Sequence, residues 1–215
     1  MIKIILVDDH DMVRTGLKRL LEDFSDIEVI AEASSGEQAI TVVQTHKPDI
    51  ALMDLSMPGI GGFEATRKLL RIHKDLKIII VTMHNEDIFP QRLLNIGAMG
   101  YVTKEANVQE IVKAIHEVMH NKRYISPVIA HQMALAGAQD AEKSPFESLS
   151  ERELQVMLML MDGHKVNTIS EKLCLSPKTI STYRYRLYDK LGVNSDMELA
   201  RLALRYGIMD EFDIS

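Results

Sequence analysis

The sequence predicts an α/β fold for the first part of the chain, a doubly wound parallel sheet covered by helices, and a small all-helical domain after it. Three observations predict this division. Short apolar runs alternate with helix-periodic segments over residues 1–121, strand signals are absent from residues 149–215, and acidic residues directly follow two of the apolar runs. Alternating strands and helices form parallel sheets, which bind ligands at the carboxyl ends of their strands.

Length and composition favour two modest domains. The chain has 215 residues, more than a usual single domain. No apolar stretch approaches a membrane span, and the first apolar run meets Asp8 before it could form a signal-peptide core, so we expect a cytoplasmic protein without membrane association. The net charge of −6 argues against indiscriminate polyanion binding. Cys174 is the single cysteine, which excludes an internal disulfide, and its leucine neighbours predict core packing.

The first domain is predicted to span residues 1–121. Five apolar runs between turn and helix signals are interpreted as its strands. They are Ile2–Val7, Val29–Ala33, Ile50–Met53, Ile78–Val81 and Tyr101–Val102. Segments with apolar residues at helical spacing lie between and after these strands. They follow Asp11, run near Gly36–Thr45, Phe63–His73 and Phe89–Ile96, and begin again at the capping pair Asn107 and Glu110.

Residues 122–148 are predicted to be a linker, because they contain Pro127 and Pro145 around a polar, alanine-containing stretch that can hold one short helix. The second domain is then residues 149–215, and its helices have clear start and stop signals. Helices are predicted to start at Ser150, near Asn167, at Ser176 followed by Pro177, and at Ser195, with Gly163, Gly192 and Gly207 as stops.

Three acids follow the ends of two predicted strands: Asp8 and Asp9 after the first, and Asp54 after the third. If both strands belong to one parallel sheet, these carboxylates meet at its carboxyl edge. Clustered carboxylates repel one another unless a proton or a divalent cation is shared, and Mg²⁺ accepts oxygen ligands while leaving positions for phosphate oxygens. The arrangement predicts a metal-assisted phosphate site.

Two further residues complete this constellation, since Thr82 ends the fourth predicted strand and Lys104 follows the fifth. For phosphoryl transfer to Asp54, Asp9 would hold the cation, Asp8 would assist through water, Thr82 would donate to a phosphoryl oxygen and Lys104 would neutralise another. Each residue alone has a simpler explanation, because acids cap helices and lysines are solvated. The coincidence of five such residues at successive strand ends favours the site.

These residues stand in motifs that resemble the receiver domain of two-component response regulators. The motifs are Leu6-Val7-Asp8-Asp9-His10, Leu52-Met53-Asp54-Leu55-Ser56-Met57-Pro58-Gly59, Val81-Thr82 and Tyr101-Val102-Thr103-Lys104. The resemblance implies a flavodoxin-like (βα)5 sheet of order 2-1-3-4-5, phosphorylation of Asp54 by a sensor histidine kinase, and Mg²⁺ held by Asp9, Asp54 and the backbone carbonyl of Ser56.

The same resemblance implies a switch in which phosphorylation draws Thr82 inward and frees space for Tyr101, so that the surface of the fourth and fifth helical segments changes its packing. The residues themselves leave open whether Tyr101 is instead a half-buried strand aromatic.

The segment Ser176–Leu191 is a local basic patch in an acidic chain. Four cations stand against one acid, Asp189, with hydroxyl and aromatic residues between them. The cations are Lys178, Arg184, Arg186 and Lys190. Cations near phosphates supply much of nucleic-acid affinity, and short polar side chains on a helix can read base edges in the major groove. A solvated helix face is the alternative on composition alone.

Three motifs of this region resemble the LuxR-type output domain. They are Leu149-Ser150-Glu151-Arg152-Glu153, Ile169-Ser170-Glu171-Lys172-Leu173 and Leu175-Ser176-Pro177-Lys178-Thr179-Ile180. By this likeness Ser181, Thr182 and Tyr185 face base edges of double-stranded DNA, and the phosphate contacts come from Lys178, Thr179, Arg184 and Lys190. Tyr183 and Tyr185 stand where the family often has histidine and lysine, which leaves the recognised bases open.

A receiver followed by a LuxR-type domain is the NarL/FixJ architecture of DNA-binding response regulators. Within that family the segments Ser144-Pro145-Phe146, His164-Lys165-Val166 and Tyr183-Arg184-Tyr185-Arg186 resemble GacA-type global regulators. The likeness implies a hybrid sensor kinase, a homodimer when phosphorylated, RNA polymerase as a partner, and activation of small regulatory RNA genes that affect virulence and growth phase.

Two other functions compete with this one. The first is a Mg²⁺-dependent phosphohydrolase with Asp54 as its nucleophile, although Ser56 stands where such enzymes typically have a second acid. The second is a protein-interaction switch whose last helices bind a partner other than DNA, which the basic patch disfavours. We expect a regulator that is not an enzyme.

Overall fold

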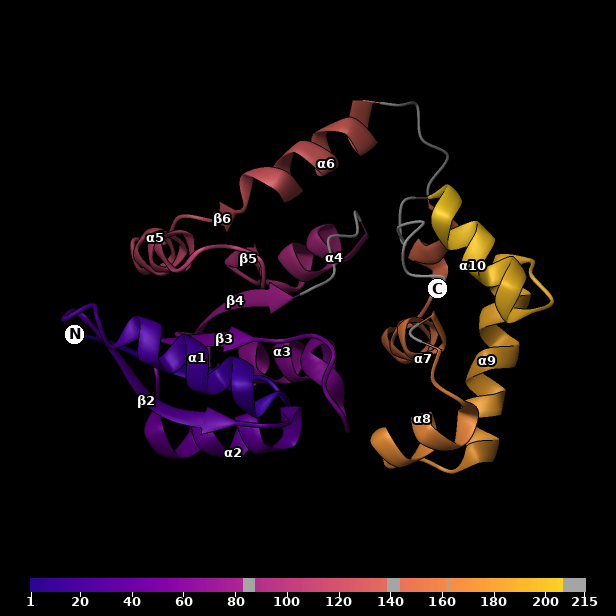
Figure 1. Cartoon of the computed structure of the whole chain (residues 1–215), viewed down its shortest axis with the longest axis horizontal. Helices are drawn as coiled ribbons and strands as arrows, with labels where there is room; N and C mark the ends of the chain where they lie inside the picture. The colour runs from indigo at the N-terminus through magenta and orange to yellow at the C-terminus, as the bar shows by residue number, and fades with distance from the viewer. Residues whose placement is uncertain (83–87, 139–143, 162, 207–215) are drawn as a thin grey trace. The chain divides into compact units, whose positions relative to one another are not determined.

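The computed structural model of the chain describes residues 1–82, 88–138, 144–161 and 163–206 (Figure 1). The chain divides into two compact units. The first comprises residues 1–85 and 90–131, and the second comprises residues 86–89 and 132–215. Within the described ranges, no helix combines the length and the apolar character needed to cross a membrane.

The first unit is a parallel sheet with helices between its strands, as predicted. Its strands are β1 (Ile2–Val7), β2 (Ile27–Ala33), β3 (Ile50–Met53), β4 (Lys77–Thr82), β5 (Gly100–Thr103) and β6 (Tyr124–Ile125), and they lie in the order β2-β1-β3-β4-β5-β6. Its helices are α1 (Asp11–Leu21), α2 (Gly36–His46), α3 (Gly61–Ile72), α4 (Ile88–Ile96) and α5 (Val108–Met119). The predicted order 2-1-3-4-5 is confirmed for the first five strands.

Side-chain alternation along the strands builds a core on each face of the sheet. Ile4 and Leu6 of β1, with every second residue of the neighbouring strands, pack in one cluster with Leu21 of α1 and Ile115 of α5. Because successive strand side chains point to opposite faces, the alternate residues face the other side. They are buried too, which is why the strands read as continuous apolar runs.

The sixth strand was not predicted, whereas a helix after it was expected as one short helix within the linker. Tyr124 and Ile125 pair with Gly100 and Tyr101 of β5 and extend the sheet by one strand. The residues assigned to a linker also contain the helix α6 (Pro127–Ala138), which has 12 residues, and the 3₁₀ turn η1 (Pro145–Ser148). A strand of two residues is too short to show a hydrophobic period, so the sequence carried no signal for it.

The second unit is helical. Its remaining helices are α7 (Glu151–Met161), α8 (Val166–Lys172), α9 (Pro177–Leu191) and α10 (Asp196–Arg205). The predicted caps are confirmed at Ser176 and Ser195, whose side chains accept from the backbone N–H of the third residue on, and at Gly192, which adopts a left-handed conformation. Gly207, the predicted stop of the last helix, lies outside the described residues.

In the first unit, the start of α3 lies very close to the backbone of Asp54 at the end of β3. A Cβ added at Gly62, in the first turn of α3, would lie 1.8 Å from the carbonyl oxygen of Asp54. The N–H of Gly62 also donates to the carbonyl of Leu55 at 3.1 Å. A side chain at position 62 would therefore push the start of α3 away from the end of β3.

We expect Gly62→Ala to lower the free energy of unfolding by about 2 kcal/mol or more, because strand end and helix must separate. The matched control is Gly16→Ala in α1, where an added Cβ meets nothing within 4 Å. It should raise the free energy of unfolding by about 0.5 to 1 kcal/mol, since alanine is the better helix former. Urea unfolding followed by circular dichroism measures both. A Gly62→Ala variant as stable as the original chain would contradict the close approach.

Candidate functional site

The strand register brings the predicted acids together. Val7 and Met53 are register partners in neighbouring parallel strands, so the residues that follow them leave the same edge of the sheet. The N–H of Asp54 donates to the carbonyl of Val7 at 2.8 Å, and the N–H of Asp8 donates to the carbonyl of Ala33 at 3.1 Å. These bonds continue the sheet to the acids themselves, which places them on rigid backbone.

Lys104 lies between two of the carboxylates, as its position after β5 predicted. Its ammonium nitrogen is 2.6 Å from Asp8 Oδ2 and 2.9 Å from Asp54 Oδ2; both acids are buried, and the Lys104 side chain is 9% exposed. Burial lowers the pKa of the Lys104 ammonium, but the charges of Asp54 and Asp8 outweigh burial and raise the pKa above its usual value. Lys104 is therefore a fixed positive charge at this edge.

Asp54 is only 2% exposed. Burial raises the pKa of its carboxyl, and the charge of Lys104 reduces this rise without cancelling it, while the charge of Asp8 adds to it. The N–H of Leu55 donates to Asp54 Oδ1 at 2.8 Å, which orients the group. A buried, oriented carboxylate whose charge is incompletely balanced is suited to react with an electrophile or to bind a cation.

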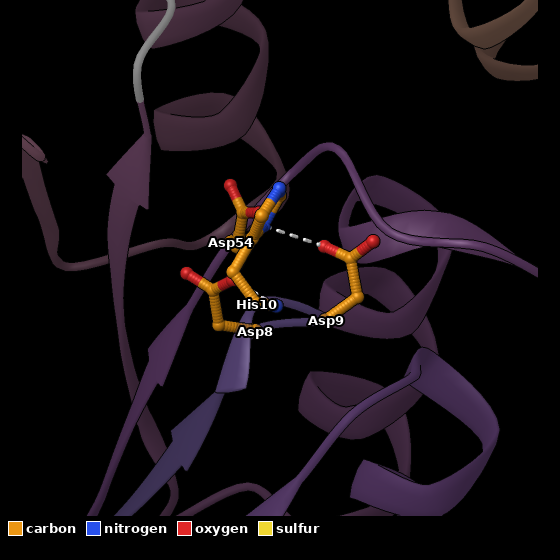
Figure 2. A group of neighbouring side chains, drawn as sticks. All are labelled: Asp8, Asp9, His10 and Asp54. Atoms are coloured by element: carbon orange, nitrogen blue, oxygen red, sulfur yellow. Dashed lines mark hydrogen bonds and ion pairs between the residues drawn. The ribbon is translucent and has the colours of Figure 1, made fainter. Parts of the chain in front are cut away.

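The donor set fits a divalent cation. One ligand atom from each of Asp8, Asp9, His10 and Asp54 lies within 4.8 Å of the others (Figure 2). Asp9 Oδ1 and Asp54 Oδ2 are buried and have no hydrogen bond with suitable angles, although His10 and Lys104 lie at ion-pair distance from them. Since buried carboxylate oxygens normally have hydrogen-bond partners, these two fit a metal ion.

The other predicted residues of this site lie where their strands end. Thr82 is fully buried at the end of β4, opposite Thr103 of β5, and Ser56 is exposed in the loop after β3. Tyr101 is a fully buried strand aromatic of β5 and not a half-buried one. The roles of these three residues in a reaction stay predictions.

Three residues support the site without having been predicted to do so. His10 contacts the acids directly. The guanidinium of Arg14 donates to the carbonyl of Asp8, and Glu37 Oε1 of α2 accepts from the N–H of Ile60 at 2.9 Å in the loop that follows Asp54. His10 could have been found from its place beside Asp9, whereas the contacts of Arg14 and Glu37 need the tertiary structure.

In the second unit, α8 and α9 form a helix-turn-helix. The N–H of Leu175 donates to the carbonyl of Ser170 at 2.9 Å and closes the turn. Ile169, Leu173 and Ile180 pack with Val156 of α7 and hold the two helices in place. Cys174 lies in this turn with a positive φ of 53° and is exposed, so the prediction that it packs in the core is wrong.

The exposed face of α9 carries four of the residues predicted to contact DNA. Lys178, Ser181, Thr182 and Tyr185 lie three or four positions apart on one face, and Tyr185 is 73% exposed. Arg186 is exposed beside them. Thr179 is partly buried in the cap of α9, where its hydroxyl lies 2.8 Å from that of Ser176.

Two predicted phosphate contacts are engaged within the unit. Arg184 donates from Nε to the hydroxyl of Tyr188 at 2.8 Å and from its terminal nitrogen to Asp196 Oδ2 at 2.6 Å. Lys190 donates to Glu153 Oε2 at 2.7 Å and to the carbonyl of Ser148 at 3.1 Å. These contacts give both cations a structural role. Arg184 connects α9 to α10, and Lys190 connects α9 to the start of α7.

Glu153 is the buried partner of Lys190. It is 3% exposed, and the N–H of Ser150 donates to its Oε2 at 2.7 Å. Burial raises the pKa of Glu153, but the hydrogen bonds from Lys190 and Ser150 outweigh burial and hold the pKa below its usual value. The predicted capping pair of Ser150 and Glu153 is thus confirmed, and it also neutralises a cation of α9.

The raised pKa of Asp54 predicts a pH-dependent effect of Asp54→Asn. Below the unfolded pKa of about 3.9, the carboxyl is protonated in both the folded and the unfolded chain. Above that pH the unfolded chain ionises more readily, so the Asp54 carboxyl increasingly destabilises the folded state. We expect the variant to unfold with a free energy about 1 kcal/mol higher at neutral pH, and the gain to vanish below about pH 4. Urea unfolding at both pH values measures this.

The control is Asp75→Asn, an exposed acid outside the site, which should change the free energy of unfolding by less than about 0.5 kcal/mol. If Asp54→Asn were less stable than the original chain at neutral pH, the charge balance described above would be wrong.

Comparison with known proteins identifies both units. Residues 4–116 match the response regulator receiver domain, and residues 147–203 match the luxR family of bacterial regulatory proteins. Response regulator GacA of Pseudomonas aeruginosa is 54% identical over 211 residues, which cover 98% of this chain and 99% of that protein. Response regulator UvrY of Escherichia coli K12 is 51% identical over 216 residues, with 100% and 99% covered.

Solved structures agree with this assignment. RcsB of Salmonella enterica serovar Typhimurium, bound to the promoter rprA in the presence of the phosphomimetic BeF3⁻, matches with a TM-score of 0.69 and 26% identity over 94% of this chain and 97% of that one. The relatives are named response regulators and the chain carries a luxR-family domain, which is consistent with a regulator that is not an enzyme. The chain belongs to the LuxR-family response regulators and is a GacA- and UvrY-like DNA-binding regulator of transcription.

Proposed function

We propose that Asp54 accepts a phosphoryl group from a phosphohistidine of a sensor kinase, and that this modification controls how α9 binds duplex DNA. A receiver domain implies a kinase partner. The observation that carries the proposal is the Lys104 ammonium held between Asp8 and Asp54, beside buried carboxylate oxygens that lack hydrogen bonds. This set supplies a nucleophile, a fixed cation and oxygen ligands at one point.

Receiver domains generally bind Mg²⁺ at an acidic pocket, and the acids of this chain fit that pocket. We assign the cation to Asp9, Asp54 and the backbone carbonyl of Ser56, with Asp8 assisting through water. The cation would neutralise charge on the phosphoryl oxygens. Asp54 then attacks phosphorus with a carboxylate oxygen as the bond to the donor's nitrogen breaks, and the nitrogen takes up a proton.

The chain's own groups compensate the new charge. Lys104 already stands 2.9 Å from Asp54 Oδ2, so it can pair with a phosphoryl oxygen after a small movement. The hydroxyl of Thr82 donates to a second phosphoryl oxygen in this proposal. Because Thr82 and Tyr101 are both fully buried in neighbouring strands, a shift of one changes the space for the other and biases the surface near α4 and β5.

At the output, the exposed face of α9 enters the major groove. We assign base edges to Ser181, Thr182 and Tyr185, and phosphate contacts to Lys178, with Thr179 at the helix start and Arg186 beside them. The ion pairs of Arg184 and Lys190 favour structural roles for those two residues. One helix with few exposed cations can contact only a few phosphates, which favours binding as a homodimer. A structure of RcsB dimers bound to DNA supports this.

The pathway follows from the likeness to GacA and UvrY. We propose a hybrid-type sensor kinase as the phosphoryl donor, contact with RNA polymerase, and activation of small regulatory RNA genes that affect virulence and growth phase, all in the cytoplasm. The functional domains in this proposal are residues 1–121 and 149–215, with residues 122–148 connecting them.

Acetyl phosphate with Mg²⁺ tests the acceptor. We expect the intact mass of the chain to rise by one phosphoryl group, and Asp54→Asn to abolish the rise while the exposed-acid control Asp75→Asn keeps it. Labelling of Asp54→Asn to the same extent would place the acceptor elsewhere. Sustained turnover of acetyl phosphate beyond one equivalent would favour the phosphohydrolase instead.

Lys178 is exposed on α9, whereas Arg184 is tied to α10, so we expect their alanine variants to behave differently. Lys178→Ala should weaken binding to all duplexes alike and reduce the slope of log affinity against log salt by about 1 for each bound protomer. Arg184→Ala should lower the free energy of unfolding of the second unit by about 1 kcal/mol and leave the salt slope unchanged. Fluorescence anisotropy over a salt series measures the slopes, and a reduced slope for Arg184→Ala would return that residue to the interface.

A further inference from the structure

Among the residues that the structure describes, His10 is the histidine that lies with the acids of this site, and its backbone directs it there. It precedes α1 in an extended conformation, and its side chain makes no capping hydrogen bond to that helix. Its N–H donates to Asp8 Oδ1 at 2.8 Å, which folds the residue back over the acids. The side chain is therefore committed to the carboxylates and not to the helix.

A single ring nitrogen of His10 faces two acids. Its Nδ1 lies 3.0 Å from Asp8 Oδ1 and 3.0 Å from Asp9 Oδ1 (Figure 2). One nitrogen carries at most one proton, so it cannot make a full hydrogen bond to both oxygens at once. With a proton on Nδ1 the ring can hydrogen-bond to Asp8 Oδ1, and without that proton Nδ1 lies where it can share a cation with the two carboxylates.

Two oxygens of the site also lack a well-aligned hydrogen bond, although His10 Nδ1 and Lys104 Nζ lie at ion-pair distance from them. Asp9 Oδ1 and Asp54 Oδ2 are buried without a well-aligned hydrogen bond, and Asp54 is 2% exposed. Together with Nδ1 they make a mixed oxygen and nitrogen donor set within 4.8 Å. Mg²⁺ prefers oxygen ligands alone, whereas imidazole nitrogen suits first-row transition cations such as Co²⁺ and Zn²⁺.

We propose that His10 is a third direct side-chain ligand of the metal site, through Nδ1, beside Asp9 and Asp54, and that it makes the site prefer nitrogen-accepting transition cations over Mg²⁺ more strongly than the carboxylates alone would. The inference rests on the proposed function, in which the acids hold a divalent cation. Coordination requires the neutral ring with its proton on Nε2. The side chain is 61% exposed, so that N–H can be solvated while Nδ1 turns inward.

The test titrates the full-length chain with Co²⁺ and, separately, with Mg²⁺ by isothermal calorimetry. His10→Asn is the variant, since it keeps a polar group of similar reach without an imidazole. His46→Asn is the matched control, because His46 is exposed on α2, away from the acids. We expect His10→Asn to weaken Co²⁺ binding by about tenfold or more and Mg²⁺ binding by less than about threefold. The control should match the original chain for both ions.

The visible absorption of bound Co²⁺ gives a second readout that does not depend on the variant's stability. Its ligand-field bands should move in His10→Asn and stay in His46→Asn. Equal loss for both ions, unchanged bands, or tighter binding of both ions in His10→Asn would overturn the role of His10. The last result would show that the ring only occupies the cation's place. If the original chain bound neither ion, the metal site of the proposed function would fail instead.

Discussion

Two buried carboxylates of the same sheet edge, Asp8 and Asp54, are held together by one ammonium, that of Lys104, at 2.6 and 2.9 Å. The rest of the receiver site depends on this balance. Without Lys104 the two charges would repel each other in a poorly solvated position. With it, the site remains short of positive charge, because Asp9 adds a third carboxylate. The site is therefore suited to a divalent cation. The negative charge that a phosphoryl group adds would then be balanced by two positive groups, the Lys104 ammonium and the divalent cation.

In the second unit, acidic side chains neutralise cations, whereas in the receiver site a cation neutralises acids. Of the four cations that make α9 basic, Arg184 and Lys190 are paired with Asp196 and Glu153, although Lys190 is exposed, and Lys178 and Arg186 are exposed as well. The acid partners of these pairs stand 12 and 37 residues away along the chain. Composition alone could not reveal this pairing, because it counts charges on one helix and not the neighbours that tertiary packing brings to it.

Much of the fold could be predicted, because strand and helix periods and caps such as Ser176 and Gly192 are local signals. The acidic site could be predicted as well, since residues that follow parallel strands meet at one edge. What escaped prediction depends on contacts or on short elements. The two-residue strand β6 shows no period, and Cys174 lies between leucines yet is exposed, because the turn between α8 and α9 holds it with a positive φ.

In the function that we propose, phosphorylation of Asp54 changes how α9 binds DNA. The most direct measurement compares the affinity of one preparation for duplex DNA before and after treatment with acetyl phosphate and Mg²⁺, at fixed salt. Our account predicts tighter binding after treatment, with a steeper dependence on protein concentration as dimers form, and no change for Asp54→Asn. Equal affinity before and after full phosphorylation of the original chain would contradict it, because the two units would then act independently.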